Sequence, residues 1–251
     1  MAASGKFQFG LVSCSTHAIP QLLDELKRLL ADKSLAPRTV LYLNAHVYNR
    51  ATEDPQLAAR LNAARIVAAD GISIVWGAPL FGARLTQRCN MTEAFRAFLV
   101  DPTMPPNTAL LIGCTTEEVG AAAKQAARIS SHCRIVQAFS GFLSDDEYRQ
   151  IFSEHRNVDF IFLGMGTPKT EVITELATRL APQAIVWAIG GGTILIYAGK
   201  VKEAPAVWRR LGLQWLHRLC HAPAALWRRY LIGNPLFLCR ILKAKFRGSS
   251  R

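Results

Sequence analysis

Residues 160–171 have the sequence Phe160-Ile161-Phe162-Leu163-Gly164-Met165-Gly166-Thr167-Pro168-Lys169-Thr170-Glu171. The four apolar residues at the start of this stretch are typical of a buried strand. Two glycines allow a tight turn after the strand, and Pro168 stands where a helix commonly begins. A strand, a glycine turn and a helix in this order predict part of a βαβ unit, in which the strand belongs to a parallel sheet.

The same alternation of short apolar runs and longer amphipathic stretches continues along the chain. Further strands are predicted at 40–43, 63–67, 109–112 and 184–189. Helical patterns are found at 19–31, 55–63, 91–99, 117–129 and 145–155. Ser144 and Glu147 form a capping box at the start of the last of these helices. We therefore expect an α/β fold, with a mostly parallel sheet covered by helices on both faces.

The positive charge of the chain is concentrated near its C-terminus. Residues 200–251 hold twelve of the thirty Lys and Arg residues and a single acid, Glu203. Three of the five tryptophans lie there as well, at Trp208, Trp215 and Trp227. The abrupt change in composition predicts two units, an α/β domain over 1–199 and a basic helical appendage over 200–251.

Two kinds of partner suit a basic segment that is interleaved with tryptophan. An anionic membrane surface offers both charge and an apolar layer, and nucleic acid offers phosphate charge alone. The alternative is that these helices pack on the core and leave their basic faces in solvent. The excess of cations without acidic neighbours favours a membrane interface, with these candidate residues: Trp208, Arg209, Arg210, Trp215, Arg218, Trp227, Arg228 and Arg229.

Candidate binding residues follow the predicted strands. Ligands of open parallel sheets bind outside the carboxyl ends of the strands. Four segments stand at such positions: Asn44, Asp70-Gly71, Gly113-Cys114-Thr115-Thr116 and Gly164 to Glu171. The last segment combines close backbone approach with the cation of Lys169, which favours a ligand that carries phosphate, although a plain structural turn is the alternative.

Two further residues are candidates for catalysis, one as a general base and one as a cation that binds phosphate. Asp70 has the chemistry of a general base, and Arg88 has the guanidinium that binds phosphate oxygens in bidentate fashion. An Asp-Gly pair after a strand is also a common turn. His217, Cys220 and His221 share the spacing of zinc ligands, but no fourth ligand is evident, and we expect neither a metal nor a cofactor.

The chain shows no sign of an oxidising compartment or of a membrane span. Its six cysteines form no CxxC pair, and we expect them to be reduced, as in a cytoplasmic protein. The first ten residues lack the apolar region of a signal peptide. The longest apolar run, 183–199, is interrupted by glycines at 190–192 and predicts a strand with a glycine loop.

Several ordered motifs resemble the WecG/TagA/CpsF glycosyltransferases (glycosyltransferase family 26) over nearly the whole chain. These motifs are Leu43-Asn44-Ala45-His46-Val47, Ala69-Asp70-Gly71, Phe162 to Glu171, Ala198 to Leu219 and Trp227 to Pro235. The resemblance implies a Rossmann-like core and an appendage that sits on the inner face of the cytoplasmic membrane. It also implies transfer of a sugar, with inversion and without a metal, from a nucleotide donor that is commonly uridine diphosphate linked. The acceptor would be a lipid diphosphate in bacterial polysaccharide synthesis.

The resemblance also assigns roles to single residues. Asp70 matches the catalytic base, Arg88 matches an arginine that holds phosphate, and Gly164 to Glu171 match a donor-site segment. With the strand-end positions, the predicted substrate-binding set is Asn44, Gly113, Gly164, Gly166, Thr167, Pro168, Lys169, Thr170, Glu171 and Gly191. We expect a membrane partner, no nucleic acid, and a homo-oligomer as one possible assembly.

This chain departs from the family pattern at several positions, the first of which is Tyr42, where the family usually has Thr. Thr170 stands where the family has Gln, and Leu195 stands where it has Asp. Glu203 replaces an Arg and Gln214 replaces a Glu, which suggests that an ion pair has been exchanged for other packing. Since Asp70 and Arg88 are present, an active enzyme of altered specificity is favoured. The alternative is a non-catalytic nucleotide-sugar-binding or scaffold subunit at the membrane.

Overall fold

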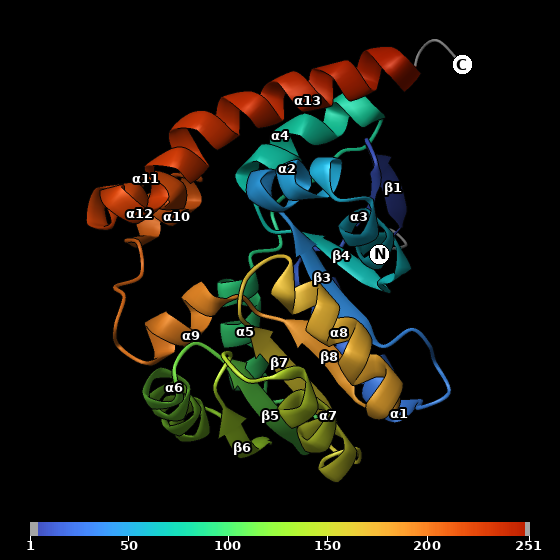
Figure 1. Ribbon diagram of the computed structural model, residues 1–251, viewed down its shortest axis with the longest axis vertical. Coiled ribbons are helices and arrows are strands. Elements are labelled where there is room, and N and C mark those ends of the chain that lie inside the picture. The colour runs from blue at the N-terminus through green and yellow to red at the C-terminus, as the bar shows by residue number, and fades with distance from the viewer. Residues whose placement is uncertain (1–4, 249–251) are drawn as a thin grey trace.

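A computed structural model describes residues 5–248, apart from the side chains of residues 210, 225, 247 and 248. Its centre is an eight-stranded sheet with the strand order β1-β2-β4-β3-β8-β7-β5-β6 (Figure 1). The strands are β1 (Lys6–Phe9), β2 (Val12–Ser15), β3 (Thr39–Leu43), β4 (Ile66–Ala69), β5 (Asn107–Gly113), β6 (Cys133–Phe139), β7 (Phe160–Gly164) and β8 (Ile185–Ala188). All neighbours pair in parallel except β1 and β2, which form an antiparallel hairpin. The predicted α/β fold is confirmed.

Helices cover both faces of this sheet. One face packs against α1 (Ile19–Ala31), α5 (Met91–Val100), α6 (Thr116–Ile129) and α9 (Gly191–Tyr197). The other face packs against α2 (Ala45–Glu53), α3 (Pro55–Ala63), α7 (Asp145–Glu154) and α8 (Lys169–Leu180). Between the first face and its helices lies a cluster of aromatic rings, in which Phe95 and Phe98 meet Trp187 edge to face.

Local sequence explains where several helices begin. Asn44 accepts a hydrogen bond from the Val47 amide and so caps α2, and the predicted capping box of Ser144 and Glu147 opens α7. The predicted helices at 19–31 and 55–63 coincide with α1 and α3.

The remaining elements lie either between β4 and α5 or after α9. They are α4 (Ile72–Gly77), the 3₁₀ turn η1 (Ala78–Phe81), α10 (Ala206–Arg210), α11 (Gln214–His221), α12 (Pro223–Trp227), the π-helical turn η2 (Arg228–Ile232) and α13 (Gly233–Gly248). We call residues 200–232 the arm. Within the arm, Gly212 adopts a left-handed φ of 71° and separates α10 from α11.

Helix α13 packs on the α/β core, as Figure 1 shows next to α2 and α4. Phe237 and Ile241 are buried, and the Phe237 ring contacts Phe9 and Tyr48. Arg240 donates to the carbonyl of Asn49 at 2.7 Å, and the Asn49 amide donates to the Gly233 carbonyl at 2.7 Å. These contacts hold α13 beside the carboxyl ends of the strands. The arm, which connects α9 to α13, passes the same edge of the sheet.

Candidate active site

A cleft of about 650 Å³ opens at the carboxyl edge of the sheet. Its lining includes a residue at or just after the end of each of the five central strands β3, β4, β5, β7 and β8, namely Asn44, Asp70, Cys114, Met165 and Gly190. The opposite wall comes from the arm and from α13. This is the position at which open parallel sheets bind ligands. A cleft of this volume can hold a molecule as large as a nucleotide.

Asp70 lies in this cleft with its carboxylate held in a fixed orientation. Oδ1 accepts hydrogen bonds from the Met91 amide at 2.9 Å and from Asn90 Nδ2 at 3.0 Å. Among the described residues, Oδ2 accepts only a long contact of 3.4 Å from Asn44 Nδ2. Because Met91 is the first residue of α5, the carboxylate also faces the positive end of that helix.

Two asparagines hold Asp70 and cap helices at the same time. Asn44 Oδ1 accepts from the Val47 amide at 3.1 Å, and Asn90 Oδ1 accepts from the Glu93 amide at 3.2 Å. Each amide group therefore points its Nδ2 donor toward Asp70. Asn44 was among the predicted residues, whereas Asn90 was missed, although an Asn directly before the helical pattern at 91–99 is a capping signal.

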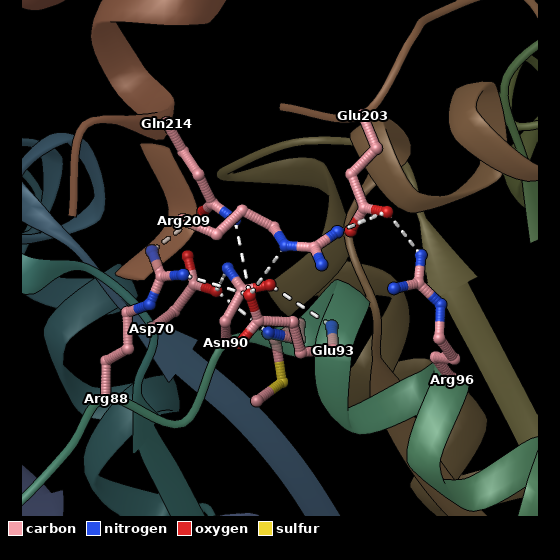
Figure 2. Close-up of polar contacts among 9 residues, drawn as sticks. Asp70, Arg88, Asn90, Glu93, Arg96, Glu203, Arg209 and Gln214 are labelled. Carbon is pink, nitrogen blue, oxygen red and sulfur yellow. Dashed lines mark hydrogen bonds and ion pairs between the residues drawn. The ribbon is translucent and has the colours of Figure 1, made fainter. Parts of the chain in front are cut away.

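Arg88 lines the cleft close to Asp70 (Figure 2). Its guanidinium donates from Nη1 to Gln214 Oε1 at 2.8 Å and from Nη2 to Glu93 Oε1 at 3.0 Å. The Cys89 amide donates to the Ala69 carbonyl at 2.9 Å, which ties the segment of Arg88 to the end of β4. Asp70 and Arg88 are thus brought together, as their predicted roles require.

The glycines of the strand ends serve close packing as well as the cleft wall. A Cβ on Gly113 would lie 2.2 Å from the Gly164 carbonyl oxygen, so these two strand ends need glycine to meet. Gly166 and Gly191 line the cleft, whereas Gly113 and Gly164 lie behind it. A Cβ on Gly192 would approach Arg218 Nη2 to 3.1 Å, which places that guanidinium against the glycine turn.

The side chains of the predicted donor-site segment point mainly away from the cleft. Thr170 is fully buried and its hydroxyl accepts from the Gly166 amide at 3.0 Å. Lys169 lies over the Tyr148 ring and reaches the Leu143 carbonyl at 3.4 Å. Thr167 donates to Glu171 Oε1 at 2.9 Å. With Pro168, these residues shape the turn, and the structure does not place them among the cleft-lining residues.

Glu171 is an acid held in the protein interior. It is 2% exposed, and Oε2 has no hydrogen-bond partner among the described residues. Burial raises the pKa of this carboxyl, because the charged form loses its hydration. Burial likewise raises the pKa of the neighbouring Tyr42 hydroxyl, with a further contribution from the charges of Glu171 and Asp70. In both groups burial shifts the equilibrium toward the protonated form.

His46 is a cleft residue that the sequence reasoning left without a role. Burial, together with the cations of Arg229 and Arg50, lowers its pKa to about 4. At neutral pH the ring is therefore uncharged and has one donor and one acceptor nitrogen. His46 belongs to the same sequence motif as Asn44. Its place in the cleft depends on where the arm packs, which the motif does not indicate.

The arm supplies a cationic wall. Trp215, Arg218 and Arg229 line the cleft, and Trp215 contacts the ring of Tyr230. Trp208, Arg209, Trp227 and Arg228 lie outside the lining, and the side chain of Arg210 is outside the described part of the structure. His217 and His221 stack with ring centroids 4.1 Å apart. Among the described residues no group of three or more His, Cys, Asp or Glu side chains is placed to share a metal ion.

The end of the cleft beyond Asp70 is apolar. Trp76, Leu80, Leu238 and Ile241 line it together with Ile72 and Phe237. Trp76 is 68% exposed, and Leu238 is 55% exposed. These residues come from α4, η1 and α13, which are far apart in sequence, so no motif predicts their assembly. The cleft therefore joins a polar, cationic half to an apolar half.

The family assignment rests on the whole chain and agrees with this site. A family model described as glycosyl transferase WecG/TagA/CpsF family matches residues 9–251. The match spans strands β2 to β8, the arm and α13, which together enclose the cleft. The chain therefore belongs to the WecG/TagA/CpsF family of glycosyltransferases, whose activity implies a nucleotide-sugar donor and an acceptor.

Proposed function

We propose that this protein is an inverting, metal-independent glycosyltransferase that moves a hexosyl or N-acetylhexosaminyl group from a uridine diphosphate sugar to a polyprenyl-diphosphate-linked acceptor. The observation that carries the proposal is the carboxylate of Asp70, which has one well-bonded oxygen and one nearly free oxygen in a cleft with three arginines. The reaction would serve bacterial cell-surface or exopolysaccharide synthesis, as the family resemblance implies.

The mechanism is a single displacement. Oδ2 of Asp70 removes the proton from the acceptor hydroxyl, and the resulting oxygen attacks the anomeric carbon from the face opposite the leaving group. The bond to the donor diphosphate breaks as the new bond forms, so the configuration inverts. Negative charge develops on the leaving diphosphate, where Arg88, Arg218 and the amides of the glycine turn at 190–192 are placed to stabilise it.

The two halves of the cleft suit a donor and an amphiphilic acceptor. The glycine turns and Arg218 favour the donor diphosphate, and the apolar wall formed by Trp76 and Leu238 favours a hydrocarbon chain. Asp70 lines the same cleft, so that an acceptor hydroxyl and an anomeric carbon could meet at its carboxylate.

A peripheral site at the inner face of the cytoplasmic membrane is supported by the surface of the arm and α13. Exposed apolar side chains gather there at Trp227, Leu231, Ile232, Leu238 and Leu242. Basic residues such as Arg228 and Lys243 alternate with them, which is the composition of an interfacial segment. Within the described residues no helix is both long and apolar enough to cross a membrane.

Vesicle co-sedimentation tests the membrane proposal. We expect binding to vesicles that contain anionic lipid, weaker binding to zwitterionic vesicles, and a loss when Leu231 and Leu242 are both changed to Asp. The Val136→Asp variant is the control, because this exposed side chain lies on β6, away from the arm. Salt-sensitive binding to RNA without any binding to lipid would overturn the proposal.

A non-catalytic, nucleotide-sugar-binding subunit is the second candidate. It is favoured by Leu195, an apolar side chain on the cleft wall, and by Thr170, whose hydroxyl is already engaged by Gly166. Uridine-nucleotide binding without transfer to any lipid-linked acceptor supports this candidate. Transfer that depends on Asp70 excludes it.

A further inference from the structure

A chain of charged and amide side chains connects the arm to helix α5 beside the cleft (Figure 2). Its members come from two regions that are about a hundred residues apart in sequence. We call this set the arm–α5 network: Arg88, Glu93, Arg96, Glu203, Arg209 and Gln214. Their side chains are between 11% and 40% exposed where an ion pair is formed, so the pairs are partly shielded from solvent.

Glu93 is the centre of the half that faces the cleft. Its Oε1 atom receives Arg88 Nη2 at 3.0 Å, Gln214 Nε2 at 3.4 Å and Arg209 Nε at 3.8 Å. One acceptor atom therefore joins a residue of the catalytic cleft to two residues of the arm. The guanidinium of Arg88 is fixed at two points, because Gln214 Oε1 accepts from its other terminal nitrogen at 2.8 Å.

Glu203 is the centre of the other half. Its Oε2 atom accepts from Arg96 Nη2 at 2.5 Å and forms an ion pair with Arg209 Nη1 at 2.7 Å. Arg96 belongs to α5 and Arg209 to α10, so this one carboxylate bridges the core and the arm. Arg209 then reaches Glu93 with its Nε atom, which links the two halves.

Only Arg88 and Gln214 line the cleft, so the other four residues act through them. We propose that Glu93, Arg96, Glu203 and Arg209 are positioning residues, which hold the arm against α5 and thereby hold the Arg88 guanidinium toward a diphosphate. This inference rests on the proposed function for its ligand. Glu203 supplies the pairing with Arg96 and Arg209, and Gln214 supplies the pairing with Arg88 and Glu93.

Coupling between the arm and the ligand follows from this arrangement. A diphosphate that binds better when Arg88 is fixed also stabilises the docked arm, because coupling between two equilibria is reciprocal. Partly exposed ion pairs are screened by salt, so both the docking of the arm and the affinity for diphosphate should weaken as ionic strength rises.

Hydrogen–deuterium exchange of residues 206–221 measures the docking of the arm without any ligand. We expect Glu203→Gln to accelerate exchange there by about tenfold, and Arg96→Gln and Arg209→Gln to have the same effect. The double variant of Arg96 and Glu203 should match the single variants, because either change breaks the same bridge. Glu175→Gln is the matched control, since this acid pairs with Arg60 of α3 and neither residue lies in the arm. Unchanged exchange in all three variants would overturn the proposal.

Calorimetry then tests the effect on Arg88 with two soluble diphosphates, uridine diphosphate and farnesyl diphosphate. If Arg88 holds the phosphates of one of these ligands, we expect Glu203→Gln to raise the Kd of that ligand by about tenfold. The affinity for uridine, which carries no phosphate, should be unchanged. The ligand that responds identifies whether donor or lipid phosphate is bound. Equal losses for uridine and the diphosphates would contradict a positioning role. If the wild type bound neither diphosphate, the proposed function would fail, whereas the exchange data would still judge the docking of the arm.

Discussion

The substitution Asp70→Asn separates the chemistry of the site from its structure. The Asn side chain keeps an oxygen that accepts from the Met91 amide and from Asn90 Nδ2. It replaces Oδ2 by an NH₂ group, which faces Asn44 Nδ2 and loses a contact of 3.4 Å. Loss of a carboxylate at a helix N-terminus costs about 1 kcal/mol. We therefore expect the melting temperature to fall by only about 2–4 °C.

The effect on turnover should be much larger. A general base contributes roughly 10²–10⁴-fold to the rate, which corresponds to about 2.7–5.4 kcal/mol of activation free energy. The assay is the release of uridine diphosphate from the sugar donor in the presence of the lipid-linked acceptor, with the Kd of uridine diphosphate measured in parallel. We expect the rate to fall within that range while the Kd changes by less than about twofold.

A matched control is available in Asp101. This carboxylate also accepts from a backbone amide, that of Thr103 at 2.9 Å, but it lies at the far end of α5 and outside the cleft. Asp101→Asn should leave turnover unchanged. Turnover of Asp70→Asn within threefold of the wild type would refute the assignment of Asp70 as the base.

Three further predictions concern buried groups. Because the folded protein raises the pKa of Glu171 above its unfolded value, this group lowers the stability as pH rises above about 4.5. Urea unfolding at pH 5 and pH 8 should thus show Glu171→Gln gaining stability relative to the wild type at the higher pH, and a pH-independent difference would contradict this. Phe237→Ala should cost about 3–5 kcal/mol in the same unfolding assay, because a 1% exposed ring between Phe9 and Tyr48 is lost; a loss below 1 kcal/mol would show that α13 is not docked. Burial raises the pKa of Cys114 to about 11, so alkylation of its peptide, followed by mass spectrometry, should still accelerate between pH 9 and 10.5; a plateau reached by pH 8.5 is the opposing result.

The sequence predicted those parts of the fold that depend on strong local signals. The apolar runs at 160–163 and 109–112 became β7 and β5, because continuous burial on both faces leaves an unambiguous pattern. Edge strands leave a weaker pattern. Strand β6 has several exposed residues, and the hairpin of β1 and β2 has only four residues in each strand. Neither was predicted.

The residues of the candidate site likewise fall into those that the sequence predicted and those that it did not. Asp70, Asn44 and Arg88 were predicted because strand-end positions and motifs mark them, and all three line the same cleft. Trp76 and His46 were missed as cleft residues, because their positions depend on where the arm and α13 dock. The resemblance suggested that Glu203 and Gln214 have exchanged an ion pair for other packing, and in the structure they bond to Arg96 and Arg88, respectively. Such partners lie about a hundred residues away and leave no local signal.

Thermal denaturation with uridine diphosphate tests the central claim most directly, which is that the cleft at the strand ends is a uridine-nucleotide site that needs no metal. At a ligand concentration of 100 times the Kd, binding stabilises the folded state by about 2.7 kcal/mol. This corresponds to a rise in melting temperature of about 5–10 °C. The account predicts that rise for uridine diphosphate in the presence of EDTA, and a smaller rise for uridine. Absence of any shift with uridine nucleotides at millimolar concentration, with or without EDTA, would contradict it.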